Sequence, residues 1–89
     1  MLRDIVNLRI FVTVADCKSF TRAAAVGDLT QGAISIRIKR LEKQIGMRLF
    51  DRSNQQLQLT AEGEIFLPYV LRILAVYDEA KSDIEQSRL

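Results

Sequence analysis

Apolar residues recur every three or four positions along much of this chain, which is the spacing of one face of an α-helix. The first such stretch predicts a helix over residues 4–17, with its apolar face made of Ile5, Leu8, Phe11, Val12 and Ala15. The clearest stretch predicts a helix over 31–45, ended by Gly46, with a single buried stripe made of Ile34, Ile38, Leu41 and Ile45.

Between these two segments, a short helix-prone run over residues 21–26 follows Ser19 and is ended by Gly27 and Asp28. Ser19 and Thr30 each precede a helical segment, where a side-chain oxygen can accept a free backbone N–H. The pattern therefore predicts three helices, with a turn of about three residues between the second and the third.

The period changes after Gly46. Residues 57–59 alternate apolar and polar side chains, as a short strand does, and follow the polar stretch 53–56. We expect a small β-hairpin over residues 49–59.

The last segment predicts a long helix that starts after Thr60 and spans ~40 Å if it continues to the end of the chain. Its apolar residues repeat in steps of four and three, the seam of a helix that pairs with another: Phe66, Val70, Ile73, Tyr77, Ala80 and Ile84. A second row, Leu67, Leu71 and Leu74, runs beside the seam, and Pro68 predicts a bend. We expect one row to pack on its own domain and the seam on a partner; the alternative places both rows in the monomer core.

Charge is distributed unevenly although the net charge of the 89 residues is only +2. Residues 31–56 carry six basic and two acidic side chains, whereas residues 60–89 carry six acidic and three basic ones. A basic middle suggests a surface that faces a polyanion, and an ordinary solvated face is the alternative.

The composition excludes several classes of site. The chain has no histidine and one cysteine, Cys17, so it forms no internal disulfide, lacks a zinc ligand set and cannot build a histidine-dependent catalytic triad. We expect no enzyme activity and no cofactor. No apolar run is long enough to span a membrane and no signal peptide opens the chain, so we expect a cytoplasmic protein without a membrane partner.

Three helices in this order, with a short second helix, form the helix-turn-helix arrangement whose third helix enters the major groove of DNA. Opposite the buried stripe of residues 31–45, a helical wheel places Gly32, Ile36, Lys39 and Lys43, flanked by Ala33, Ser35 and Arg40. Gln31 and Ser35 can hydrogen-bond base edges, and Lys39 and Arg40 can reach phosphate or guanine.

Ile36 and Arg52 each have two possible interpretations. Ile36 faces away from the core, either as a tolerated surface residue or in contact with a thymine methyl group. Arg52, in the hairpin, would bind the DNA backbone or the minor groove as part of a wing, and an ordinary surface hairpin is the alternative.

Several short motifs follow one another along the chain: Leu8-Arg9-Ile10-Phe11-Val12, residues 19–24 (SFTRAA), residues 30–35 (TQGAIS), Leu41-Glu42, Gly46, residues 48–52 (RLFDR) and residues 59–63 (LTAEG). Their order and spacing resemble the N-terminal part of LysR-type bacterial transcriptional regulators over roughly residues 4–75. The resemblance implies a mainly α fold: a winged helix-turn-helix over residues 1–59, with a three-helix core and a β-hairpin wing, followed by a long dimerising linker helix over 60–89. It also implies an effector-binding C-terminal domain absent from this fragment, and a tetramer at full length.

The resemblance, together with the wheel, gives a set of expected site residues. DNA contacts are expected at Ser19, Thr21, Arg22, Thr30, Gln31, Gly32, Ala33, Ser35, Ile36, Arg37, Lys39, Arg40, Arg52, Ser53 and Asn54, and the dimer seam at Phe66, Val70, Ile73, Tyr77 and Ile84. The sequence departs from the family pattern at Gly32, where proline is usual, at Ile36, where arginine is frequent, and at Gly27, where a leucine packs. These departures predict an altered operator preference.

Two other functions fit the same basic surface. Winged helices also serve as protein adaptors, so the basic face can instead bind an acidic protein. A sequence-indifferent architectural DNA-binding protein is the second alternative, and it would bind operator and random duplex alike.

Overall fold

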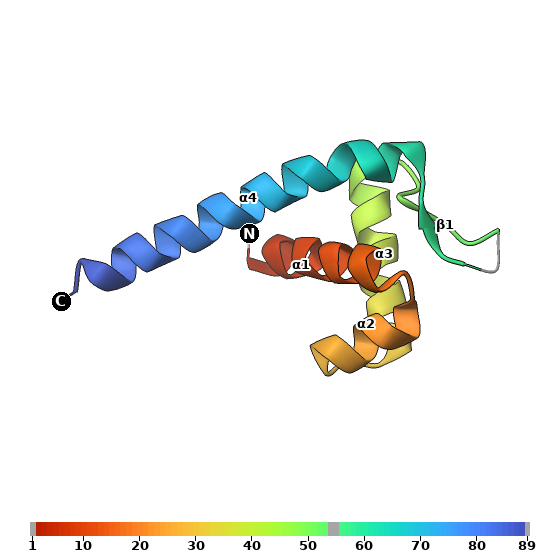
Figure 1. Cartoon of the computed structure of the whole chain (residues 1–89), viewed down its shortest axis with the longest axis horizontal. Coiled ribbons are helices and arrows are strands. Elements are labelled where there is room, and N and C mark those ends of the chain that lie inside the picture. Colours follow the sequence, from red (N-terminus) through yellow and green to blue (C-terminus); the bar gives the residue numbers. More distant parts are fainter. Residues whose placement is uncertain (1, 54–55, 89) are drawn as a thin grey trace.

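The computed structural model describes residues 2–53 and 56–88, and it forms a small helical body from which one long helix projects (Figure 1). The elements, in chain order, are α1 (Leu2–Cys17), α2 (Phe20–Gly27), α3 (Gln31–Ile45), β1 (Phe50–Asp51), β2 (Gln58–Leu59) and α4 (Ala61–Gln86). The two strands pair antiparallel, with Phe50 opposite Leu59 and Asp51 opposite Gln58. The predicted winged helix-turn-helix with a long last helix is therefore confirmed, although α1 begins two residues earlier than expected.

Hydroxyl side chains cap three of the helices, as the sequence predicts. Ser19 Oγ accepts the backbone N–H of Arg22 at 3.2 Å, and Thr30 Oγ1 accepts that of Ala33 at 3.0 Å. Thr60 Oγ1 accepts the backbone N–H of Gly63, also at 3.0 Å. Each cap satisfies one of the free donors at a helix start, which contributes ~1 kcal/mol, and the caps fix where α2, α3 and α4 begin.

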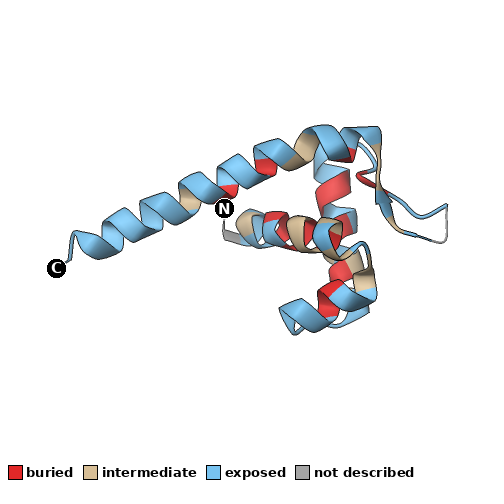
Figure 2. Ribbon diagram, in the orientation of Figure 1, coloured by how far each residue is buried: buried red, intermediate tan, exposed pale blue. Residues whose placement is uncertain are grey.

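The core lies where α1, α2 and α3 meet the hairpin and the first half of α4, as the buried residues in Figure 2 show. Phe11 of α1 is completely buried at its centre. Its ring lies 5.4 Å from the ring of Phe50 on β1 and 5.4 Å from that of Phe66 on α4. The ring of Phe20 on α2 lies 6.1 Å from that of Phe50. This aromatic row, Phe66-Phe11-Phe50-Phe20, joins four elements in tilted and edge-on ring contacts.

The predicted buried stripe of α3 is correct at Ile34, Ile38 and Leu41 and wrong at Ile45, whose side chain is 43% exposed. Residues 43–48 are all exposed, so the buried face of α3 ends before its last residues. A charged residue, Glu42, is buried near the end of α3 instead.

The assignment of the α4 seam to a partner is wrong at Val70, which is completely buried in its own domain. Phe66 is half-buried against Phe11 and belongs to the same core. The second row is divided too, since Leu74 is buried whereas Leu71 is 49% exposed. The domain takes residues from both rows because α4 approaches the core with the face that lies between them.

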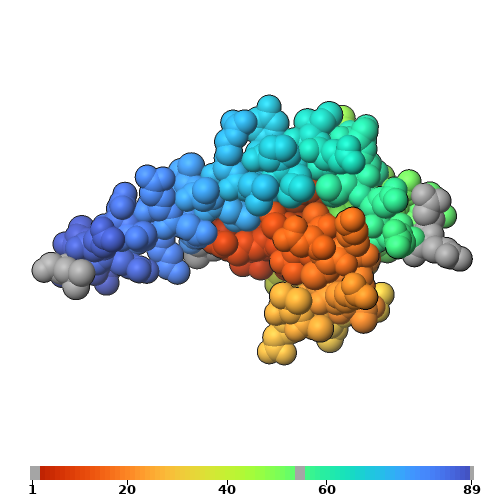
Figure 3. All heavy atoms as spheres, in the orientation of Figure 1, coloured from red at the N-terminus to blue at the C-terminus, as the bar shows by residue number. Residues whose placement is uncertain are grey.

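The apolar face of α4 that is left uncovered is offset from the predicted seam. It consists of large apolar side chains that are 44–66% exposed and follow one side of the helix: Ile65, Tyr69, Ile73, Val76 and Ile84. We refer to these five residues as the exposed α4 stripe. The C-terminal half of α4 extends away from the body, as the space-filling view shows (Figure 3). α4 continues through Pro68 without a break, and the predicted bend stays a prediction.

A bidentate pair adds one further link between α4 and the body. Arg9 of α1 donates from both terminal nitrogens to the carboxylate of Asp78, and both side chains are about half exposed. Within residues 2–53 and 56–88, no helix combines the length and the apolar character needed to cross a membrane.

The start of α4 is fixed by a close approach to the residue before β1. The backbone N–H of Thr60 donates to the carbonyl oxygen of Leu49 at 2.9 Å, and Thr60 Oγ1 donates to the carbonyl of Arg48 at 2.7 Å. A Cβ atom placed on Gly63 would lie 2.3 Å from the Leu49 carbonyl oxygen, a distance that non-bonded atoms do not tolerate. A residue with a side chain at position 63 would therefore clash with the backbone of Leu49, and only glycine fits there.

The substitution Gly63→Ala should lower the free energy of unfolding by about 1–3 kcal/mol or more, because backbone must move to admit the methyl group. Thermal and urea unfolding followed by circular dichroism measure this loss, and ~1 kcal/mol corresponds to ~4–8 °C in a domain of this size. Gly32→Ala is the matched control, since its added Cβ would meet only Thr30 Oγ1 at an ordinary 4.0 Å. The close-approach argument is wrong if both variants unfold at the same temperature.

Candidate nucleic-acid interface

The face of α3 that points away from the core carries the side chains that the helical wheel selected. Gly32, Ile36, Lys39, Arg40 and Lys43 are exposed, while Ala33 and Ser35 are half-buried. Ile36 is 54% exposed and stands among polar and cationic neighbours. The face is thus a cationic surface with one apolar residue near its middle.

The start of α2 lies against the start of α3. Thr21 Oγ1 donates to Gln31 Oε1 at 3.3 Å, and both residues are exposed. Arg22 is exposed on the next position of α2. Ser19 and Thr30 each accept one backbone N–H with the hydroxyl oxygen in the caps. Each hydroxyl hydrogen therefore remains available as a donor toward a ligand.

The aromatic row of the core holds Arg52, the arginine of the hairpin. Its guanidinium lies over the ring of Phe20, 4.2 Å from the ring centre, in a cation–π contact. Arg52 Nη2 also lies 3.5 Å from Ser35 Oγ on α3. These two contacts position the flexible side chain of Arg52 against α3, so that its charge extends the cationic surface beyond the helix.

Glu42 is buried and holds the residues after α3 in place, although the sequence pattern, in which it belongs to the Leu41-Glu42 motif, assigned it no role. Its Oε2 accepts the backbone N–H of Leu49 at 2.7 Å and that of Phe50 at 3.3 Å. The same oxygen lies 3.4 Å from Arg48 Nε. The available signal was a glutamate next to Leu41 of the apolar stripe, in the last turn before Gly46. A carboxylate buried at such a position requires hydrogen-bond partners.

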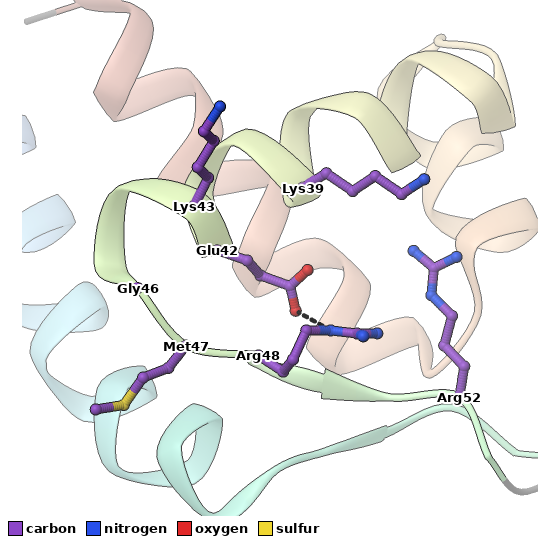
Figure 4. Close-up of a pocket in the computed structure, with 7 residues that line it drawn as sticks. All are labelled: Lys39, Glu42, Lys43, Gly46, Met47, Arg48 and Arg52. Carbon is purple, nitrogen blue, oxygen red and sulfur yellow. Dashed lines mark ion pairs between the residues drawn. The ribbon is translucent and has the colours of Figure 1, made fainter.

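Beside Glu42, an open groove is lined by α3, by the loop that follows it and by Arg52, with four cations and one carboxylate along it (Figure 4). The residues that line it are Lys39, Glu42, Lys43, Gly46, Met47, Arg48 and Arg52. Because Glu42 is occupied by Arg48 and two backbone donors, the groove presents a net positive charge suited to an anion.

Asp51 is the last residue of β1, and its Oδ1 accepts the backbone N–H of Ser53 at 2.9 Å where the chain leaves the strand. Hydrogen bonding by the hydroxyl and backbone N–H of Ser53 lowers the pKa of the Asp51 carboxyl, and the charge of Arg48 lowers it further. Asp51 is therefore ionised at neutral pH and its carboxylate holds Ser53 in the turn. Asn54, the last residue of the expected DNA-binding set, lies outside the described residues.

Arg37 projects toward α1 and not toward the hairpin. Its Nη1 donates to the side-chain oxygen of Asn7, which is 3% exposed, at 3.2 Å. Arg37 and Ser35 therefore lie on opposite flanks of α3. The described residues contain no cluster of three acidic or cysteine side chains that could hold a metal ion.

Residues 5–64 match the family model of bacterial regulatory helix-turn-helix proteins of the lysR family. The chain belongs to the lysR family. The HTH-type transcriptional regulator CitR of Bacillus subtilis (strain 168) is 40% identical over 81 residues, which are 91% of this chain and 28% of CitR. The chain thus spans just over a quarter of that relative's length.

Solved structures of lysR proteins have the same fold. The LysR family transcriptional regulator VV2_1132 superposes with a TM-score of 0.93 at 35% identity, over 96% of this chain and 29% of that one. The BenM DNA-binding domain in its complex with catB site 1 DNA superposes with a TM-score of 0.89 at 31% identity, over 94% of both chains. The resemblance inferred from the motifs is therefore confirmed at the level of family and fold.

Proposed function

We propose that this chain is the sequence-specific double-stranded DNA-binding module of a bacterial transcriptional regulator. The observation that carries the proposal is the continuous cationic surface formed by the exposed face of α3 and the stacked Arg52. BenM, whose DNA-binding domain has the same fold, was crystallised on catB site 1 and benA site 1 DNA. A surface of this charge and shape is what a helix entering the major groove requires.

The residues divide into base-reading and backbone-binding groups in this proposal. Gln31, Gly32, Ala33, Ser35 and Ile36 contact base edges, because they lie in the first two turns of α3. Phosphates are bound by the start of α2, the cations of α3 and the hairpin, that is, by Ser19, Thr21, Arg22, Thr30, Arg37, Lys39, Arg40, Arg52, Ser53 and Asn54.

Residues 1–59 act as the DNA-binding domain and residues 60–89 as the linker, and α4 joins two copies into a dimer. The exposed α4 stripe supports this part of the proposal, since five large apolar side chains in one row lack a covering element among the described residues. Ile73 and Ile84 keep their predicted role in the interface, Tyr77 lies half-buried at its edge, and Phe66 and Val70 are withdrawn from it. Two-fold pairing presents two α3 helices to inverted half-sites of an operator.

The wider protein is proposed to act in the bacterial cytoplasm, on the nucleoid when bound. An effector-binding domain C-terminal to this chain senses a small molecule, and the full-length protein assembles as a tetramer. This chain is assigned neither a cofactor nor catalysis in this proposal, because the exposed face of α3 carries lysine, arginine and short polar side chains, which suit nucleic-acid binding.

Binding to duplex DNA should weaken steeply with salt, by ~10³–10⁵ between 50 and 200 mM for six to ten phosphate contacts. Fluorescence anisotropy with a duplex selected from a random pool, and with a scrambled duplex of equal composition, measures both salt slope and specificity. Arg52→Ala should reduce the slope by ~1 while lowering affinity for both duplexes by a similar factor.

The outcomes separate the candidate functions. Equal affinity for selected and scrambled duplex would favour an architectural protein, and the absence of duplex binding at 50 mM salt would favour a protein adaptor. If Arg52→Ala leaves affinity and slope unchanged, the hairpin has no role as a wing.

Ile36→Ala should weaken binding at operator variants that carry one particular A·T pair, by ~0.8 kcal/mol for each methylene no longer buried, because a thymine methyl group then loses its apolar contact. The measurement compares both proteins on a panel of single-base variants of the selected duplex. A uniform loss across the panel would show that Ile36 does not read that pair.

The exposed α4 stripe predicts a dimer at tens of micromolar protein in sedimentation equilibrium. Ile73→Glu should dissociate it, because a carboxylate cannot be buried unpaired between two apolar faces. Glu79→Gln, a change at an exposed position of the same helix outside the stripe, serves as the control. A wild-type monomer that still binds an inverted-repeat duplex with full affinity would contradict the dimer.

A further inference from the structure

Three arginines gather on the flank of α3 that lies away from the hairpin. Arg3 and Val6 of α1 and Arg37 and Arg40 of α3 line a shallow recess there. Arg3 and Arg40 are exposed, whereas Arg37 is half-buried. The two acidic-basic pairs that the described residues form involve Arg9 and Arg48, so none of these three guanidinium groups is neutralised by a carboxylate within those residues.

One of the three arginines, Arg37, is held in place by a hydrogen bond to α1. Asn7, buried in α1, accepts a hydrogen bond from Arg37 Nη1 at 3.2 Å and so orients that guanidinium. The neighbouring carboxylate of α1, Asp4, accepts from Gln44 Nε2 at 3.4 Å. Placing three permanent cations around one recess costs repulsion, which an anion seated between them would remove.

The position of the recess identifies the anion. An α-helix of ~10–12 Å diameter fills a major groove that is ~12 Å wide, so a phosphodiester strand runs along each of its flanks. Residues 35 and 37 point ~160° apart around α3, and they do so in the structure: Ser35 lies next to Arg52, and Arg37 next to Asn7 of α1. The hairpin and the recess therefore face opposite strands.

Resting on the proposed function, we propose that Arg3, Arg37 and Arg40 form a second phosphate-binding site, which grips the DNA strand across the groove from Arg52. Val6, which lines the recess and is 43% exposed, provides an apolar contact for a deoxyribose. The site anchors α3 from both sides of the groove and contributes affinity without reading bases. Arg3 becomes part of the interface, although it lies about thirty residues before α3 in the chain.

The double variant Arg3→Gln/Arg40→Gln tests the site without disturbing the hydrogen bond between Arg37 and Asn7. Its charge-matched control is Lys81→Gln/Arg88→Gln, which removes two cations from exposed positions near the end of α4. Circular dichroism and the thermal midpoint check that both variants are folded. Anisotropy with the selected and the scrambled duplex then gives affinity as a function of salt.

We expect the arginine variant to lose affinity for both duplexes by the same factor and to reduce the salt slope by about 1–2, at ~0.9 for each phosphate contact. The control should keep the wild-type slope. The inference is overturned if the two variants have equal slopes while wild-type binding stays steeply salt-dependent. If wild-type protein itself binds no duplex, it is the proposed function that fails.

A second measurement locates the contact. Single methylphosphonate groups, which remove one phosphate charge at a time, are placed along both strands of the selected duplex. Positions that weaken wild-type binding but not binding by the Arg3→Gln/Arg40→Gln variant mark the phosphates held by the recess. They should lie on the strand opposite those identified in the same way with Arg52→Ala. Coincidence of the two sets on one strand would refute the second site.

Discussion

The carboxylate of Glu42 is the contact on which the arrangement of the other parts depends. It lies 8% exposed near the end of α3, and one of its oxygens accepts two consecutive backbone N–H groups, those of Leu49 and Phe50. Hydrogen bonds to an ionised acceptor are among the strongest that proteins form. Without that oxygen, two buried donors would lack a partner, at a cost of about 1–3 kcal/mol each. Glu42 therefore sets the position of β1 relative to α3.

Two further constraints extend from this contact. Leu49, held to α3 by its amide, uses its carbonyl to receive Thr60, so the same residue fixes the hairpin and the start of α4. Phe50, held in the same way, takes its place in the aromatic row that ends at Phe20, the ring on which Arg52 lies. The cationic surface is thus a product of the core, and its outermost arginine is positioned by buried rings and a buried charge.

The elements were predictable because their signals are local: Ser19, Thr30 and Thr60 cap the helices, and Gly46 ends α3 in the left-handed conformation, at φ 85°. The exposed face of α3 followed from periodicity in the same way. The two rows of α4 were misassigned, because a repeat of three and four shows that two faces are apolar but not which one meets the domain. Val70 settles this only through its burial. Arg3, which is added to the interface only by proposal, has no signal in the sequence, because it is close to Arg37 and Arg40 in space alone.

The close contact of Gly63 with Leu49 restricts the orientation in which α4 leaves the domain. α4 is 26 residues long. At 1.5 Å per residue, a tilt of only about 5° there would displace the far end by ~3 Å. That displacement is close to the ~3.4 Å rise of one base pair. In a dimer held together along α4, the number of base pairs separating the two half-sites would be determined at this junction, by residues that are not themselves proposed to touch DNA.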